Sequence, residues 1–195
     1  MYVLTVDQRR SRRRVDLVEG ALGALNDDPS RPLVRGFERT AGDEMQAVVA
    51  NPAVAADLAL DLAVSNRWSV GIGVGGVVTP LPESTRAGSG EAFERAREAV
   101  TAAKTSPGNV AVSGAREEAG HAEAVLQLLV SVARKRSRQA TEAGMLSDEG
   151  LTQQQIADRL GITQQAVSSR LHSGLWPEWR RARLAAQALL EGADR

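Results

Sequence analysis

Residues 151–173 constrain the fold more than any other part of the chain, because their capping and turn residues fit two short helices joined by a tight turn. Thr152 followed by Gln155 three residues later is the pattern of an N-terminal capping box. Gly161 can adopt the left-handed conformation that ends a helix, and Thr163 can cap the helix that follows. The segment therefore predicts a helix-turn-helix.

The apolar and polar residues of this segment separate onto two faces. Apolar residues recur four apart in each helix and predict the inner faces: Ile156 and Leu160, then Val167 and Leu171. The polar residues of the second helix are expected to point outward and to contact DNA: Thr163, Gln164, Gln165, Ser168, Ser169 and Arg170. Glutamine can pair with adenine, arginine with guanine, and serine with bases or phosphates. The spacing of Ala157, Gly161 and Val167 resembles bacterial helix-turn-helix repressors and sigma-factor-like DNA readers, which implies double-stranded DNA as a partner.

The second helix carries one arginine and no lysine, so phosphate contacts must come from other segments. We expect them from basic residues in the final helix and in the segment before the module: Arg180, Arg181, Arg183 and the run 134–138. Trp176 and Trp179 are expected to pack the final helix onto the module. Two alternatives remain open, a helical hairpin that only packs or dimerises, and a module that binds RNA polymerase or another protein.

Strand and helix patterns alternate through residues 1–115. Residue spacing predicts a strand at 2–7, a helix ending near 26, a hairpin at 34–50, a helix at 52–65, a strand at 68–79, a helix at 91–104 and a strand at 110–113. A long helix at 116–143 follows. This order predicts an α+β fold. We divide the chain into an α+β domain (1–115), a connecting and dimerisation helix (116–145) and a small all-α helix-turn-helix domain (146–195).

The strand at 68–79 contains the GxGxxG spacing, with glycines at 71, 73 and 76. A dinucleotide site would require a helix to begin directly after these glycines, so that its N-terminus could hold a pyrophosphate. Val77, Val78 and Thr79 instead continue the strand pattern, and two prolines follow. We therefore reject a Rossmann-type interpretation.

Three acidic residues stand where the strand order would bring them to one end of the sheet. Asp7 ends the first strand, and Asp43 and Glu44 lie in the turn of the hairpin. Carboxylates at the ends of adjacent strands can share Mg²⁺ or Mn²⁺, whose charge then binds the phosphates of a nucleotide. Arginines after the first strand could add phosphate contacts: Arg9, Arg10 and Arg12. The alternative is that the acids are turn residues and the arginines form a solvated face.

With Gly42 to Gln46 and the helix at 92–97, these acids resemble the palm-type domain of class III nucleotide cyclases. The chain resembles the SatD-like family of bacterial proteins more closely, through the strand-end Asp, the Gly-Asp-Glu-x-Gln hairpin and the later Ala-Arg helix. The resemblance covers residues 1 to about 115 and implies a ferredoxin-like fold in which Asp7 and Asp43 hold metal ions on a nucleotide. Glu94 and Glu98 stand where cyclases carry an asparagine and an arginine, so we expect no catalysis.

The chain has no cysteine, which excludes disulfides, zinc ribbons and thiol catalysis. It shows no signal-peptide pattern and no long apolar run, so we expect a cytoplasmic protein without membrane contact. These features predict a homodimeric transcription regulator that binds DNA, with a non-catalytic cyclase-like domain that senses a nucleotide or another phosphorylated ligand. The alternative is a metal-dependent nucleotide cyclase or nucleotidyl- or phosphotransferase that uses Asp7 and Asp43.

Overall fold

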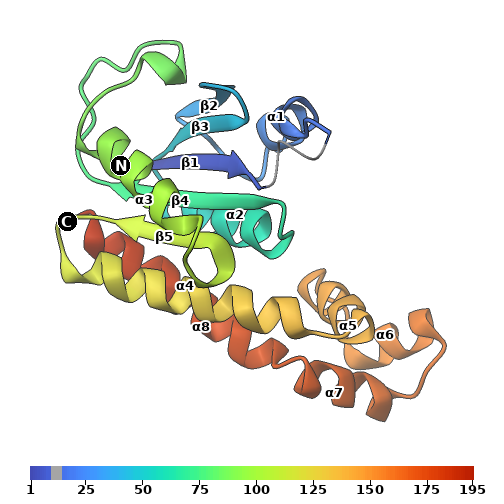
Figure 1. The fold of residues 1–195 in the computed structure, drawn as a ribbon. Helices are drawn as coiled ribbons and strands as arrows, with labels where there is room; N and C mark the ends of the chain where they lie inside the picture. Colours follow the sequence, from blue (N-terminus) through green and yellow to red (C-terminus); the bar gives the residue numbers. More distant parts are fainter. Residues whose placement is uncertain (10–14) are drawn as a thin grey trace.

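A five-stranded sheet positions the other parts of the molecule (Figure 1). The computed structural model describes residues 1–9 and 15–195. The strands are β1 (Tyr2–Gln8), β2 (Arg35–Arg39), β3 (Glu44–Val49), β4 (Trp68–Val74) and β5 (Val110–Ser113). The helices are α1 (Val18–Asn26), α2 (Pro52–Val64), α3 (Glu91–Ala103), α4 (Glu117–Lys135), α5 (Arg138–Asp148), α6 (Gln153–Leu160), α7 (Gln164–Ser173) and α8 (Trp176–Ala193).

The strand order in the sheet is β2-β3-β1-β4-β5. β1 lies at the centre and pairs antiparallel with both β3 and β4. β2 is antiparallel to β3, whereas β4 and β5 are parallel and are connected through α3. The register places Asp7 of β1 opposite Glu44 on one side and opposite Ser69 on the other. The predicted α+β fold and the predicted order of elements up to β5 are confirmed.

Alternate residues of each strand face two different helical layers. Tyr2, Leu4 and Val6 of β1 face the larger core, to which α1, α2, α4 and α8 all contribute buried residues. Val3 faces the other side and packs with residues of α3. This alternation makes a three-layer body (Figure 1). On the second face α3 covers β1, β4 and β5, and Val77 and Leu81 of the loop before α3 pack on the same side.

The glycines of β4 allow α3 to approach the sheet closely. A Cβ atom on Gly73 would lie 2.0 Å from the carbonyl oxygen of Ala92, and one on Gly71 would lie 2.1 Å from the backbone nitrogen of Val100. Both distances are far below van der Waals contact, so only glycine fits at these two positions. The repeated glycines of this strand therefore serve helix packing.

Two predicted elements are wrong in length. The strand predicted at 68–79 ends at Val74, which pairs with Tyr2 of β1, and the chain then leaves the sheet for the loop before α3. The helix predicted at 116–143 is broken into α4 and α5. Arg136 and Ser137 have extended backbone angles, and the Ser137 side chain accepts a hydrogen bond from the Ala140 amide to begin α5.

The break at Arg136 and Ser137 starts a second packing unit. We call α5, α6 and α7 the three-helix unit. These helices share a core that includes Leu146, Ile156 and Val167. The boundary predicted at 145/146 therefore falls inside α5. α8 then returns along α4 and α2, and its residues Ala186 and Leu190 join the core of the α+β body. None of the helices among the described residues has both the length and the apolar composition that a membrane span requires.

Candidate nucleic-acid interface

The turn between α6 and α7 is built by the residues that the sequence indicates. Thr152 and Gln155 form a reciprocal capping box at the start of α6. Gly161 ends α6 with a φ of 65°, a conformation that glycine adopts without strain. The Thr163 hydroxyl accepts a hydrogen bond of 3.1 Å from the Ala166 amide and begins α7. Each helix end is satisfied locally, which fixes the angle at which α7 leaves the turn.

α7 presents one polar face to solvent. Val167 and Leu171 are buried against the core of the three-helix unit, as predicted. The residues predicted to contact DNA lie away from that core: Thr163, Gln164, Gln165, Ser168 and Ser169 are exposed, and Arg170 is half-buried. Amide, hydroxyl and guanidinium groups on the exposed side of a helix are the groups that pair with base edges in a major groove. Whether they contact DNA stays a prediction.

Arg136 connects the three-helix unit to the α+β body, a role that the sequence did not reveal. Its guanidinium lies 4.3 Å from the ring centroid of Trp176 and 4.9 Å from that of Trp179. Its Nε atom donates a hydrogen bond of 2.7 Å to the carbonyl oxygen of Gly174, at the end of α7. Burial lowers the pKa of Arg136 to about 10. Arg136 therefore holds the end of α7 against the start of α8.

The two tryptophans at the start of α8 contact two other helices, α5 and α4. Trp176 is buried in the three-helix core, and its Nε1 donates a hydrogen bond of 3.1 Å to Asp148 of α5. A Cβ atom on Gly144 would lie 2.2 Å from the Trp176 ring, so the ring lies directly on the backbone of α5. The Nε1 of Trp179 donates to the carbonyl oxygen of Leu129 in α4. The prediction that both tryptophans pack the final helix onto the module is confirmed for Trp176 and wrong for Trp179, which packs against the core of the α+β body.

Only part of the predicted basic set is exposed for phosphate contacts. Arg134 donates to the carbonyl oxygens of Ala63 and Gly108, and Arg183 forms a two-pronged pair with Asp57 of α2. The hydrogen bonds with Asp57 raise the pKa of Arg183. With Arg136, these arginines hold elements together. The exposed basic residues of the predicted set are Lys135, Arg138, Arg180 and Arg181, of which Arg180 lies 3.4 Å from Asp148.

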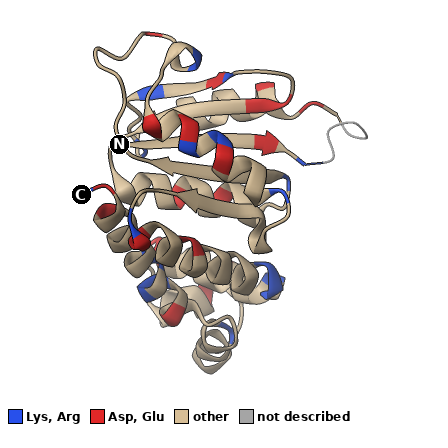
Figure 2. Cartoon of the chain, turned by 60° about the vertical axis from the view of Figure 1, so that its left-hand side comes forward, with Lys and Arg blue, Asp and Glu red and all other residues tan. Residues whose placement is uncertain are grey.

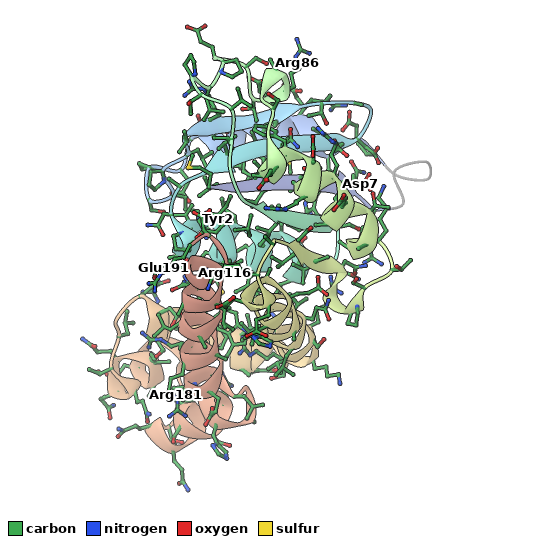
Figure 3. All side chains as sticks on the ribbon, turned by 90° about the vertical axis from the view of Figure 1, so that its left-hand side faces the viewer. Tyr2, Asp7, Arg86, Arg116, Arg181 and Glu191 are labelled. Carbon is green, nitrogen blue, oxygen red and sulfur yellow. The ribbon has the colours of Figure 1, made fainter. Side chains whose placement is uncertain are left out.

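The acids predicted to hold a metal lie at one end of the sheet. Asp7 is opposite Glu44 in the β1–β3 register, and the Gln8 amide donates to the carbonyl oxygen of Asp43. Asp7 is labelled in Figure 3. Its carboxylate pairs at 2.8 Å with Lys104, the residue that follows α3. Glu44 accepts a hydrogen bond of 2.6 Å from the Thr40 hydroxyl. Among the residues described, no three acidic, histidine or cysteine side chains are grouped so that they could hold a metal ion.

Of the three arginines predicted to bind phosphate, the structure describes one, Arg9. Arg9 is half-buried and donates to the carbonyl and side-chain oxygens of Asn66. Arg10 and Arg12 lie outside the described residues. Lys104 was missed as the partner of Asp7, because it is separated from Asp7 by most of the α+β domain and its position depends on where α3 ends.

Comparison with known families supports the DNA-binding segment. Residues 135–175 match the family model described as Sigma-70, region 4. The match covers the break after α4 and the helices α5, α6 and α7, so it includes the turn and the exposed face of α7. The chain therefore carries a helix-turn-helix region of a DNA-binding type, consistent with a role in transcription regulation. The match does not extend to residues 1–134, where the SatD-like and cyclase-like resemblance stays a prediction. Neither a curated protein nor a solved structure matches the chain.

Proposed function

We propose that the protein is a sequence-specific transcription regulator that reads the major groove of DNA with the exposed face of α7. One observation carries the proposal: α7 turns a broad polar surface away from the core, on a capped helix within the segment that matches Sigma-70, region 4. Arg170 and the two glutamines supply direct readout, since arginine pairs with guanine and glutamine with adenine. The exposed basic residues Arg138 and Arg181 add contacts to phosphates.

The test is DNA capture with the full chain. The protein is incubated with sheared genomic DNA, the retained fragments are sequenced, and binding to the enriched sequence is measured at several salt concentrations. A discrete motif, bound with an affinity that falls steeply as salt rises, is the expected result, because phosphate neutralisation releases counterions. Retention without any enriched motif, at every salt concentration, would contradict sequence-specific reading.

We propose in addition that residues 1–115 form a ferredoxin-like sensor for a nucleotide or another phosphorylated ligand. The strand order β2-β3-β1-β4, with every neighbour antiparallel, supports this fold, because a βαββαβ chain of the ferredoxin-like type has this order. The placement of Asp7, Asp43 and Glu44 at one end of the sheet supports the site. A cation there would compete with Lys104 for the Asp7 carboxylate.

Calorimetry tests the sensor. Mg²⁺ or Mn²⁺ alone is expected to bind weakly, since few acidic ligands are present, and to bind more tightly together with a nucleoside triphosphate. Asp7→Ala should abolish the gain. Tight metal binding without a nucleotide, or no binding in any combination, would contradict the proposal. Turnover of any of the four triphosphates, lost in Asp7→Ala and Asp43→Ala, would instead support the enzyme alternative.

A further inference from the structure

One exposed row of residues runs the length of α4. Residues 117, 121, 124, 128, 131 and 135 are separated by alternating steps of four and three, so they lie on one face of the helix. We call this face the outer row: Glu117, His121, Ala124, Leu128, Ser131 and Lys135. All are exposed except Ser131, which is half-buried, and 61% of Leu128 is accessible to solvent. A leucine so open to water on a long helix is a candidate contact for another chain.

The opposite face of α4 is fully occupied. Leu126, Leu129 and Val130 are buried in the core beneath the sheet, where α8 packs along the same helix. Val125 and Val132 lie between the two faces and are half-buried, so they widen the apolar part of the outer row on its α8 side. The outer row is therefore the face of α4 that remains for an intermolecular contact.

The outer row is complementary to itself when the helix is reversed. Its midpoint is residue 126, and two antiparallel copies of α4 that cross there bring each residue opposite another of matching character. Glu117 faces Lys135, His121 faces Ser131, and Ala124 faces Leu128 of the second copy. Each contact occurs twice by symmetry, as a two-fold interface requires. Figure 2 shows acidic residues near the start of α4 and basic residues at its end. In the antiparallel pair, the acidic start of one helix therefore faces the basic end of the other.

We propose that the protein forms a two-fold dimer through antiparallel packing of the outer rows of two α4 helices. Leu128 of each copy packs over the small side chain of Ala124, where the helices come closest. Glu117 and Lys135 pair at both ends, and these pairs favour the antiparallel orientation over the parallel one, which would place like charges together. The proposal does not depend on DNA binding.

The geometry also sets the positions of the two helix-turn-helix units. The three-helix unit follows the C-terminal end of α4, so antiparallel packing places the two units at opposite ends of the helix pair (Figure 1). α4 has 19 residues, and a helix of this size is about 28 Å long. This length is of the same order as one turn of DNA, roughly 34 Å, which separates the half-sites of dimeric readers.

Sedimentation equilibrium of the full chain, at concentrations up to about 100 µM, tests the dimer. We expect a monomer–dimer equilibrium that Leu128→Glu weakens at least about tenfold, because the change buries a charge at the crossing point. Leu184→Glu is the matched control: Leu184 is 64% exposed on α8, outside the outer row, and its substitution should leave the equilibrium unchanged. A wild-type chain that stays monomeric, or a dimer that only Leu184→Glu weakens, would overturn the proposal.

Charge variants test the antiparallel pairing itself. Lys135→Glu alone places two acidic residues together at each end, and Glu117→Lys alone places two basic residues together, so each variant should dimerise roughly tenfold more weakly than the wild type. Mixed in equal amounts, the two variants should form a heterodimer with both ends paired correctly. Failure of the mixture to recover wild-type association would rule out this interface, whatever the result of the DNA experiments.

Discussion

Arg136 fills the break between α4 and α5 and contacts the end of one helix and the start of another. Its guanidinium stacks on two tryptophans, and its Nε atom caps the carbonyl of Gly174. The arrangement also has a cost, because the Nη2 atom of Arg136 is buried without a hydrogen-bond partner among the described atoms. The hydrogen bond to Gly174 and the stacking on the tryptophans link the end of α7 to the start of α8 through this one side chain.

We predict that Arg136→Ala lowers the free energy of unfolding by about 1–3 kcal/mol, through loss of the stacking and of the cap on α7. Arg136→Lys should recover little of this loss, because an ammonium group lacks the planar fork of a guanidinium. Urea unfolding followed by tryptophan fluorescence measures both variants. Arg138→Ala, which removes an exposed arginine two residues away, is the control and should change stability little. Equal effects of Arg136→Ala and Arg138→Ala would contradict the role given to Arg136.

At the scale of the element, β4 shows how a strand can be adapted to its neighbouring helix. Gly71 and Gly73 leave room for α3 on one face, while Val70 and Ile72 fill the core on the other. We predict that Gly73→Val lowers the free energy of unfolding by more than about 3 kcal/mol, since the backbone of α3 would have to move. Gly76→Ala, at a position with open space around the glycine, is the matched control and should be tolerated. Thermal unfolding that ranks the two variants equally would contradict this packing.

The elements also show which features the sequence could predict. The capping residues Thr152 and Thr163 and the turn residue Gly161 act within a few residues of themselves, so α6 and α7 could be located from local patterns. The break at Arg136 and Ser137 has a local signal in the Ser137 cap, which the prediction of one continuous helix missed. The contacts of Arg136 with Trp176 and Trp179 could not be predicted, because the tryptophans lie about forty residues further along the chain. The glycines of β4 were assigned to a strand, but their purpose became clear only from the position of α3.

At the scale of the whole molecule, α8 joins the last residues of the chain to the first strand. It was predicted to belong to the helix-turn-helix domain, yet its second half packs under the sheet, where the apolar stripe of α8 completes the core. The Tyr2 hydroxyl of β1 donates a hydrogen bond of 3.1 Å to the carbonyl oxygen of Leu190, and Figure 3 shows Tyr2 close to Glu191. Sequence patterns identify α8 as a helix but carry no information on which surface covers it.

This contact gives the molecule a dependence on alkaline pH. Burial, followed by the charges of Asp194 and Glu191, raises the pKa of Tyr2 above its ordinary value of 10.0. Because the folded chain holds this proton more tightly than the unfolded chain, the resulting stability is complete below pH 10.0 and is lost as the pH rises above it. We predict that urea unfolding between neutral pH and strongly alkaline pH shows this loss, and that Tyr2→Phe reduces it. An unchanged pH dependence in Tyr2→Phe would contradict the assignment.

The most direct test of the central claim, that α7 reads DNA sequence, is a binding titration with the motif recovered by DNA capture and with motifs changed at single base pairs. We predict that Gln165→Ala and Arg170→Ala each lose about 1–3 kcal/mol of binding free energy and become indifferent to the base at one position. Gln139→Ala, an exposed glutamine on α5, should bind as the wild type does. If all three variants bind the motif and its changed forms as the wild type does, α7 does not read DNA and the account is contradicted.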